Sequence, residues 1–403
     1  MSSEYLVPEV NIGLVGHVDH GKTSLTQALT GQWTDTHSEE MKRGITIRLG
    51  YADATFYYCD ACKKYGLSVK CTSCFGDAKA KRAVSFVDAP GHETLMATVL
   101  SGSALMDGAL LLIAADETVP QPQTAEHLKI LDVVGITRIV IVQNKVDLVT
   151  EEQAMKNYQQ IKQFVKGTVA ENAPIIPVSA VHHANIDLLI EAIEQTITTP
   201  KRDTATSPLF YIARSFDVNK PGTEIPKLQG AVFGGSVIRG MFHANDKIEI
   251  KPGAKVHDKW TSLTTTVVDI VKSKQHVSEA GPGGLTAFQT NLDPALSRSD
   301  SLTGNVVGKE GTLPPVVEVL KLKVEFFDHV IGVEGNKPIE RLKQNDTLMI
   351  TVSITKTVGI VTSIGKAVEV RLKLPVVTQK DDKVALSKQM GGRWHLIGYG
   401  IVE

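Results

Sequence analysis

The stretch Gly16-His17-Val18-Asp19-His20-Gly21-Lys22-Thr23 decides how the rest of this chain is interpreted. It has the spacing G-x-x-x-x-G-K-[ST], follows an apolar run from Val10 to Val15 and precedes the segment Ser24 to Leu29. The apolar run predicts a buried strand and the later segment a helix, which is the context that a phosphate-binding loop requires. We therefore expect such a loop here rather than a chance match in a glycine-rich turn.

The residue types of this loop suit the binding of a nucleotide. The two glycines allow the backbone to curl around phosphate oxygens, because no Cβ stands in the way. Successive N–H groups at a helix start attract the anion. Lys22 would neutralise the β- and γ-phosphates, and the Thr23 hydroxyl would be a ligand of Mg²⁺. The positions of this loop expected to contact the nucleotide are Val18, Asp19, His20, Gly21, Lys22, Thr23 and Ser24.

Two further segments are expected to meet the terminal phosphate. The segment Asp88 to His92 follows a predicted strand from Ala83 to Val87. Asp88 would hold Mg²⁺ through water, Gly91 would offer its backbone N–H to the γ-phosphate, and His92 would approach an attacking water. Thr46 lies at the end of a polar stretch without periodicity, where a hydroxyl could reach Mg²⁺ in the triphosphate state.

The tetrapeptide Asn144-Lys145-Val146-Asp147 predicts which base is bound. The Asp147 carboxylate accepts two hydrogen bonds, which matches N1–H and N2–H₂ of guanine, whereas adenine would leave it unpaired. The Lys145 stem would cover the ring, and Asn144 would tie this loop to the phosphate loop. Ser179-Ala180 ends a later strand, and the Ala180 N–H would meet the guanine O6.

Four cysteines form two C-x-x-C pairs, Cys59 with Cys62 and Cys71 with Cys74, separated by the short loop from Lys63 to Lys70. Two such pairs can place four thiolates tetrahedrally around one Zn²⁺. Free thiols or a redox pair are the alternatives. Since four thiolates leave no open coordination position, we expect a structural metal.

The pattern of apolar residues changes near the middle of the chain. Before it, strands alternate with helices, which predicts an α/β domain with a mostly parallel sheet and its ligand at the carboxyl ends of the strands. After the polar linker Thr198 to Pro208, short β-branched runs predict two all-β barrels, with a joint at Pro314-Pro315. The expected domains are 1–205, with a cysteine knuckle at about 56–77, then 206–315 and 316–403.

Bulk composition excludes several classes of protein. The chain has 403 residues, of which 42% are hydrophobic, and a formal net charge of -1, so no overall basic field attracts nucleic acid. The apolar run Ala109 to Ala115 is too short to span a bilayer, and no secretory signal precedes Val10. We expect a cytoplasmic protein with no membrane partner.

Taken in order, the motifs resemble those of translational GTPases of the elongation factor Tu type. The strings Gly235 to Gly240 and Gly391 to Gly398 are similar to sequences in the second and third domains of that family. The cysteine knuckle and the string His37 to Tyr51 narrow the resemblance to the gamma subunits of archaeal and eukaryotic translation initiation factor 2, with the archaeal form fitting best.

This resemblance implies more than the spacing of residues can show. It implies a GTPase that cycles between GTP and GDP with Mg²⁺ and carries initiator methionyl-tRNA to the small ribosomal subunit and its mRNA. It also implies a heterotrimer with alpha and beta subunits. By motif, Val18 and Ile45 match a hydrophobic gate, and His92, with Thr46 and Gly91, matches the catalytic set. Asp19 matches an acidic residue that could hold a second metal ion.

Two alternatives remain beside this interpretation. One is an elongator-type aminoacyl-tRNA carrier, which the knuckle argues against. The other is a GTP-regulated scaffold with little hydrolysis, which the presence of Thr46, Gly91 and His92 argues against. A pure zinc-ribbon binder of nucleic acid would leave all the nucleotide motifs unexplained.

Overall fold

The computed structural model describes residues 6–34, 49–92, 95–331 and 338–403. Contacts within the chain divide it into two compact units, one built mainly from the chain up to Pro200 and the other mainly from the chain after it. Thr46 and Ile45, named above as candidate site residues, lie outside the described residues.

The first unit contains a seven-stranded sheet in the order β3-β2-β4-β1-β5-β6-β7. The five strands from β4 to β7 in that order run parallel, whereas β2 and β3 are antiparallel to their neighbours. This confirms the predicted mostly parallel α/β sheet. The strands are β1 (Asn11–Gly16), β2 (Gly50–Cys59), β3 (Lys64–Gly66), β4 (Lys79–Asp88), β5 (Gly108–Ala114), β6 (Ile139–Asn144) and β7 (Ile175–Pro177).

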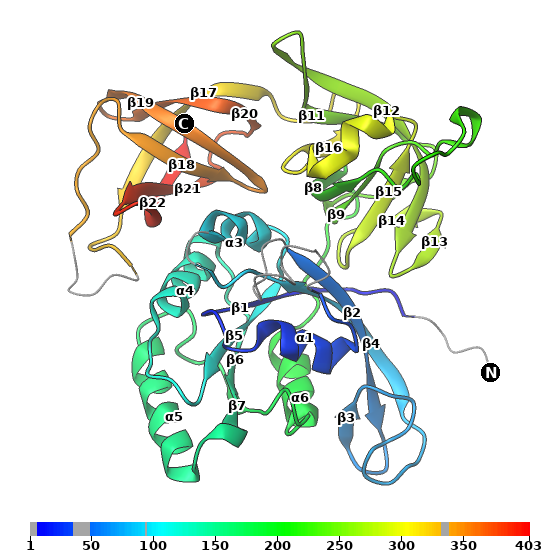
Figure 1. Cartoon of the computed structure of the whole chain (residues 1–403), viewed down its shortest axis with the longest axis vertical. Coiled ribbons are helices and arrows are strands. Elements are labelled where there is room, and N and C mark those ends of the chain that lie inside the picture. Colours follow the sequence, from blue (N-terminus) through cyan, green and yellow to red (C-terminus); the bar gives the residue numbers. More distant parts are fainter. Residues whose placement is uncertain (1–5, 35–48, 93–94, 332–337) are drawn as a thin grey trace. The chain divides into compact units, whose positions relative to one another are not determined.

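Helices cover both faces of this sheet, because its central strands are apolar along their whole length. Helices α1 (Lys22–Thr30) and α6 (Ile186–Thr196) pack on one face, in a core cluster that includes Leu14, Leu110 and Val142. The other helices lie on the opposite face (Figure 1), and they are α3 (Met96–Ser103), α4 (Pro122–Val134) and α5 (Glu151–Val165).

The cysteine-bearing insertion is more regular than the sequence indicated. The segment Lys63 to Lys70, expected to be a loop, contains the short strand β3, which pairs with the end of β2. The pairing places Tyr58 opposite Tyr65, with ring centroids 4.9 Å apart. The expectation of a plain loop was therefore wrong at these residues, since a three-residue strand is too short to show a period of two.

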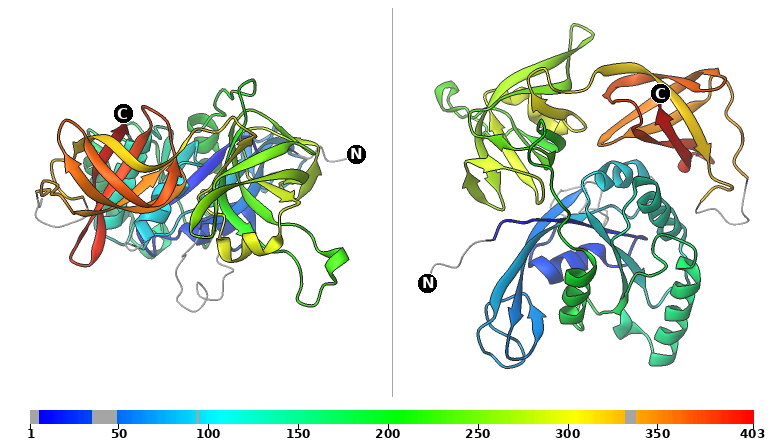
Figure 2. Two further views of the ribbon diagram at one scale, coloured as in Figure 1. Left: turned by 90° about the horizontal axis from the view of Figure 1, so that it is seen from above. Right: turned by 180° about the vertical axis from the view of Figure 1, so that it is seen from behind.

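The second unit consists of two antiparallel barrels, as predicted (Figure 2). In the first, the order is β11-β16-β8-β9-β15-β12-β13, and pairing of β11 with β12 joins the sheet to itself. Its strands are β8 (Leu209–Phe216), β9 (Val232–Arg239), β11 (Lys247–Val256), β12 (Lys259–Lys272), β13 (Gln275–Val277), β15 (Thr286–Thr290) and β16 (Val306–Lys309), beside a small pair of β10 (Phe242–His243) with β14 (Glu279–Ala280).

The second barrel is closed in the order β17-β20-β19-β18-β21-β22. A run of aliphatic side chains fills it, whereas the first barrel is filled by an aromatic cluster of Phe210, Phe233, Phe242 and Phe288. The strands are β17 (Val316–Phe326), β18 (Thr347–Val352), β19 (Thr355–Ile364), β20 (Val368–Val377), β21 (Lys383–Met390) and β22 (Arg393–Val402).

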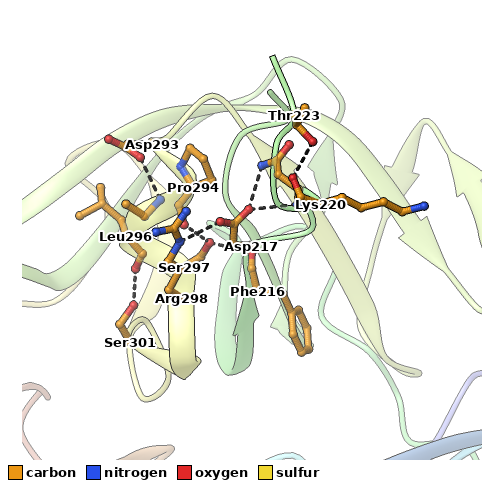
Figure 3. Close-up of polar contacts among 12 residues, drawn as sticks. Phe216, Asp217, Lys220, Thr223, Asp293, Pro294, Leu296, Ser297, Arg298 and Ser301 are labelled. Carbon is orange, nitrogen blue, oxygen red and sulfur yellow. Dashed lines mark hydrogen bonds and ion pairs between the residues drawn. The ribbon is translucent and has the colours of Figure 1, made fainter. Parts of the chain in front are cut away.

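Side-chain contacts hold the loop after β8 against the turns of η4 (Pro294–Asp300), as Figure 3 shows. The carboxylate of Asp217 accepts hydrogen bonds from Arg298 Nε at 2.8 Å and from the backbone N–H of Asn219 at 3.0 Å. Ser297 donates its hydroxyl to the carbonyl oxygen of Phe216 at 2.6 Å. The hydrogen bond from Arg298 makes the largest contribution to lowering the pKa of Asp217 below its usual value. Two segments about eighty residues apart are thereby joined.

No helix within the described ranges is both long enough and apolar enough to cross a bilayer.

Glycines of the first barrel permit an unusually close approach of two strands. A Cβ built on Gly235 would overlap the carbonyl oxygen of Tyr211 on β8, whereas one on Gly234 would meet its nearest atom at 3.9 Å. The glycine-rich string noted in the sequence is therefore partly a packing requirement of β9 against β8.

We expect Gly235→Ala to lower the free energy of unfolding by about 2 kcal/mol or more, because the backbone of β8 must move to accept the methyl group. Gly234→Ala on the same strand is the matched control and should change it by less than about 1 kcal/mol. Differential scanning calorimetry measures both. Equal effects of the two substitutions would show that the close approach at Gly235 carries no cost.

Candidate functional site

Four segments singled out in the sequence lie at one edge of the sheet. The loop from Gly16 to Thr23 leaves β1, Asp88 ends β4, Asn144 ends β6, and Ser179 follows β7. Because these strands run parallel, their carboxyl ends meet at the same edge. Pairing of β1 with β4 and β5, and of β6 with β5 and β7, thus brings the segments together.

The phosphate loop turns into α1 at Gly21, which has a φ of 85°. Lys22 follows, and its Nζ donates to the carbonyl oxygens of Gly16 at 3.1 Å and of His17 at 2.6 Å. A Cβ built on Gly91 would overlap this Nζ, so the Asp88-to-His92 segment comes right up to the ammonium group. Lys22 is thus held inside the curl of the loop, beside Gly91.

Asp88 is fully buried at the end of β4. Its Oδ2 accepts from the hydroxyl of Thr23 at 2.9 Å and from that of Thr34 at 2.7 Å. A buried carboxylate in contact with a hydroxyl at the start of a helix is a donor set that suits Mg²⁺ beside a phosphate. The sequence predicted Thr23 and Asp88 here, but gave no sign of Thr34.

Asn144 links the base-recognition loop to the phosphate loop. Its Nδ2 donates to the carbonyl oxygen of His20 at 2.9 Å, and its Oδ1 accepts from the backbone N–H of Ala180 at 3.1 Å. The N–H of Ala180, expected to meet the guanine O6, therefore has a protein acceptor here. Contact with O6 would require that bond to be shared or exchanged.

Asp147 belongs to the cavity at this edge, and its side chain is 25% exposed. A hydrogen bond from the side chain of Ser179 is the largest contribution that lowers the pKa of its carboxyl group, so it is ionised at neutral pH. His182 Nε2 lies 3.7 Å from its Oδ2. Lys145 has a φ of 62° and places its Nζ 3.7 Å from Asp116.

A cavity of about 520 Å³, a size typical of sites for small molecules, joins most of these groups, but His20, Asp88 and Ser179 are not part of its lining. His92 and Asp19, which the sequence predicted as site residues, line this cavity. Trp33, Val181 and His182 also line it, and the sequence did not predict them. Ser24, Asn144 and Ala180 also reach it. Its lining residues are Val18, Asp19, Gly21, Lys22, Thr23, Ser24, Trp33, Gly91, His92, Asn144, Lys145, Asp147, Leu148, Ala180, Val181 and His182.

The four cysteines meet at the tip of the β2–β4 insertion. The four Sγ atoms all lie within 4.8 Å of one another, and they belong to Cys59, Cys62, Cys71 and Cys74. Cys59 Sγ is 3.6 Å from Cys74 Sγ. A tetrahedron with Zn–S bonds of about 2.3 Å has sulfur atoms about 3.8 Å apart, so the donor set fits Zn²⁺.

Both cysteine pairs have the same local geometry. The residue after each second cysteine, Lys63 or Phe75, has a positive φ of 56° or 57°. Its N–H donates at 2.9 Å to the carbonyl oxygen of the first cysteine of its pair. Two matching turns facing each other are a built arrangement rather than a chance meeting of thiols.

Comparisons with known proteins agree with this geometry. The family model for the elongation factor Tu GTP binding domain matches residues 8–199, and that for the C-terminal part of initiation factor eIF2 gamma matches 318–402. Translation initiation factor 2 subunit gamma of Methanocaldococcus jannaschii is 54% identical over 400 residues, which is 98% of this chain and 97% of the relative. That of Pyrococcus furiosus is 52% identical over the same shares of both chains.

The chain belongs to the family of translation initiation factor 2 gamma subunits.

Solved structures of more distant proteins share the fold of this gamma subunit. Elongation factor SelB of Methanococcus maripaludis, in complex with the GTP analogue GPPNHP, has a TM-score of 0.73 at 21% identity, over 99% of this chain and 80% of its own. Bacterial selenocysteine-specific elongation factor EF-Sec has a TM-score of 0.74 at 23% identity, over 98% of this chain and 58% of its own. Family membership makes this gamma subunit a translational GTPase, and delivery of initiator tRNA is the role of the family.

Proposed function

We propose that this gamma subunit binds GTP with Mg²⁺ in the cavity at the sheet edge, hydrolyses it, and in the GTP form delivers initiator methionyl-tRNA to the small ribosomal subunit and its mRNA. The observation that carries the proposal is that one cavity is lined by a lysine suited to phosphates and a carboxylate suited to guanine, Lys22 and Asp147. A nucleoside triphosphate has complementary groups at its two ends.

At the phosphate end, Lys22 would exchange its loop carbonyl partners for the β- and γ-phosphates. Thr23 and Asp88 would hold Mg²⁺, with Thr46 and Asp19 as further ligands. When bound, the ion neutralises charge that develops on the phosphates. The buried position of Asp88 supports this, because an ionised carboxylate in such a place is stable only beside donors or a cation.

Hydrolysis would depend on positioning rather than on a covalent intermediate. Gly91, whose backbone approaches Lys22 Nζ, would direct its N–H to the γ-phosphate. His92 lines the same cavity and would orient the attacking water, with Val18 limiting access beside it. The oxygen of that water would bond to the γ-phosphorus while the bond to the β-phosphate oxygen breaks, a proton of the water would pass to the released phosphate, and GDP and phosphate would leave.

At the base end, Asp147 would accept two hydrogen bonds from guanine, Lys145 would cover the ring, and Asn144 would keep this loop against the phosphate loop. Ser179 supports the role of Asp147, because its hydrogen bond stabilises the charged form that the base donors need. Ala180 would share its N–H with O6.

Replacement of Asp147 by Asn should reduce affinity for GDP roughly a hundredfold, for a loss of about 3 kcal/mol, and raise affinity for xanthosine diphosphate, whose O2 can accept from the amide. Competition binding with the two nucleotides measures this. Asp116→Asn is the matched control, since Asp116 contacts Lys145 but does not line the cavity. A variant that still prefers GDP would remove Asp147 from base selection.

We also propose that the four cysteines hold one structural Zn²⁺. The support is the mutual distance of the four sulfur atoms and the repeated turn geometry. The insertion around them is largely exposed and has few buried apolar side chains, so a metal cross-link would supply the stability that a core cannot.

The zinc proposal predicts one Zn²⁺ per chain by elemental analysis of protein purified without chelator. Cys59→Ser should abolish it and increase proteolysis within residues 56–77, while GDP affinity changes less than about threefold, because no cysteine belongs to the nucleotide site. Ser73→Ala, at an exposed non-ligand between Cys71 and Cys74, should leave the zinc content unchanged. Wild-type protein without zinc would contradict the assignment, and loss of GDP binding in Cys59→Ser would show that the knuckle supports the whole sheet.

We also propose partners, a location and domain bounds for this chain. The name of the relatives, translation initiation factor 2 subunit gamma, supports assembly with alpha and beta subunits. We propose a cytoplasmic location, in accord with that assembly. We further propose that the domains are 1–205, 206–315 and 316–403, because the first barrel strand begins at Leu209 and the second barrel begins at Val316.

The GTP form should bind initiator methionyl-tRNA more tightly than the GDP form, by about 5- to 150-fold for a typical coupling. Filter binding with a non-hydrolysable GTP analogue and with GDP measures the coupling. Elongator methionyl-tRNA is the matched control and should bind more weakly. Equal affinity for the two tRNAs would favour an elongator-type carrier, and equal affinity in both nucleotide states would exclude a GTP-controlled switch.

A further inference from the structure

Helix α4 places a histidine directly beneath the phosphate loop. His127 is fully buried, and its ring Nδ1 lies 2.7 Å from the backbone N of Gly16, the first residue of the loop, 111 residues earlier in the chain. No motif includes His127, and the function derived above does not use it.

The contact fixes the proton of the ring. A backbone N–H can only donate, so Nδ1 must be the acceptor, and the neutral ring carries its proton on Nε2. Burial, followed by the positive charge of Lys22, lowers the pKa of His127 well below its ordinary value. His17 and His20 are the other ionisable groups that face it, and both also have lowered pKa values.

Nε2 of His127 is itself buried and has no hydrogen-bond partner among the residues that the structure describes. A buried donor without an acceptor costs free energy. An apolar side chain of similar size would avoid that cost. The hydrogen bond that Nδ1 accepts from Gly16 is therefore the interaction that favours a histidine over an apolar residue at this position.

Gly16 has little freedom to move. It has a φ of 144°, and a Cβ built on it would overlap the carbonyl oxygen of Leu112. Its own carbonyl oxygen accepts from Lys22 Nζ. Gly16 therefore donates its N–H to His127 and, with its carbonyl oxygen, accepts from the ammonium group of Lys22.

We propose that His127 is a positioning residue of the phosphate loop. By accepting from the Gly16 N–H it fixes the Val15–Gly16 peptide, and so holds in place the residue whose carbonyl oxygen accepts from Lys22 before a phosphate arrives. The inference rests on the proposed role of Lys22 as the phosphate-binding cation.

The first test compares two variants of the full chain in titrations with a fluorescent GDP. His127→Leu removes the acceptor and should weaken GDP binding on the order of tenfold, the effect of one buried amide left without an acceptor. His127→Gln retains an acceptor oxygen and should stay within about threefold of the wild type. Thr124→Val is the matched control, since Thr124 is equally buried on α4 and its hydroxyl has no partner among the described residues.

Equal GDP affinities of the Leu and Gln variants would overturn the proposal, as would equal losses in His127→Leu and Thr124→Val. Wild-type protein that binds no GDP would instead refute the nucleotide site on which the proposal rests, so the two failures are distinct.

The second test measures the protonation state and tautomer of the His127 ring in wild-type protein, so it does not depend on the folding of a variant. Two-dimensional ¹H–¹⁵N spectra of the wild-type imidazoles at neutral pH should show His127 uncharged, with hydrogen on Nε2 and with Nδ1 acting as an acceptor. A protonated ring, or hydrogen on Nδ1, would overturn the proposal.

Discussion

Parallel pairing of β4, β1, β5, β6 and β7 is the constraint on which the rest of this gamma subunit depends. Gly13 of β1 pairs with Val87 of β4 and with Ala109 of β5, so the carboxyl ends of these three strands lie close together. Each strand then releases its loop at the same edge, and one cavity collects groups from Val18 to His182. Loss of that register would separate Lys22 from Asp147 without changing either residue.

Polar groups of the site are already engaged with one another. Lys22 donates to two loop carbonyls, Asp88 accepts from two hydroxyls, and the N–H of Ala180 donates to Asn144. These bonds satisfy groups that burial would otherwise penalise, and they hold the side chains near the positions that a nucleotide needs. Binding is then an exchange of partners, with little ordering of side chains, which lowers its entropic cost.

The sequence predicted the sheet, the two barrels and most of the cavity, because those features have local patterns: strand, glycine-rich turn and helix, or an apolar period of two. It missed β2 and β22, and it missed Thr34, Trp33 and His127. The contacts of Thr34 with Asp88 and of His127 with Gly16 join residues 54 and 111 positions apart. No local pattern encodes such a contact, since threonine and histidine are ordinary residues in a loop and a helix.

The residues of the site lie far apart in the sequence, and this determines at what stage of synthesis the site can form. Contacts that shape the phosphate loop come from His127 and Asn144, and the wall of the cavity is finished by Ala180. During synthesis, residues 16–23 leave the ribosome long before those partners exist, so the loop spends that time without its tertiary supports. Closing such long chain segments is slow compared with forming a helix or hairpin. A nascent chain therefore gains the ability to bind nucleotide in one late step, after the whole sheet has emerged.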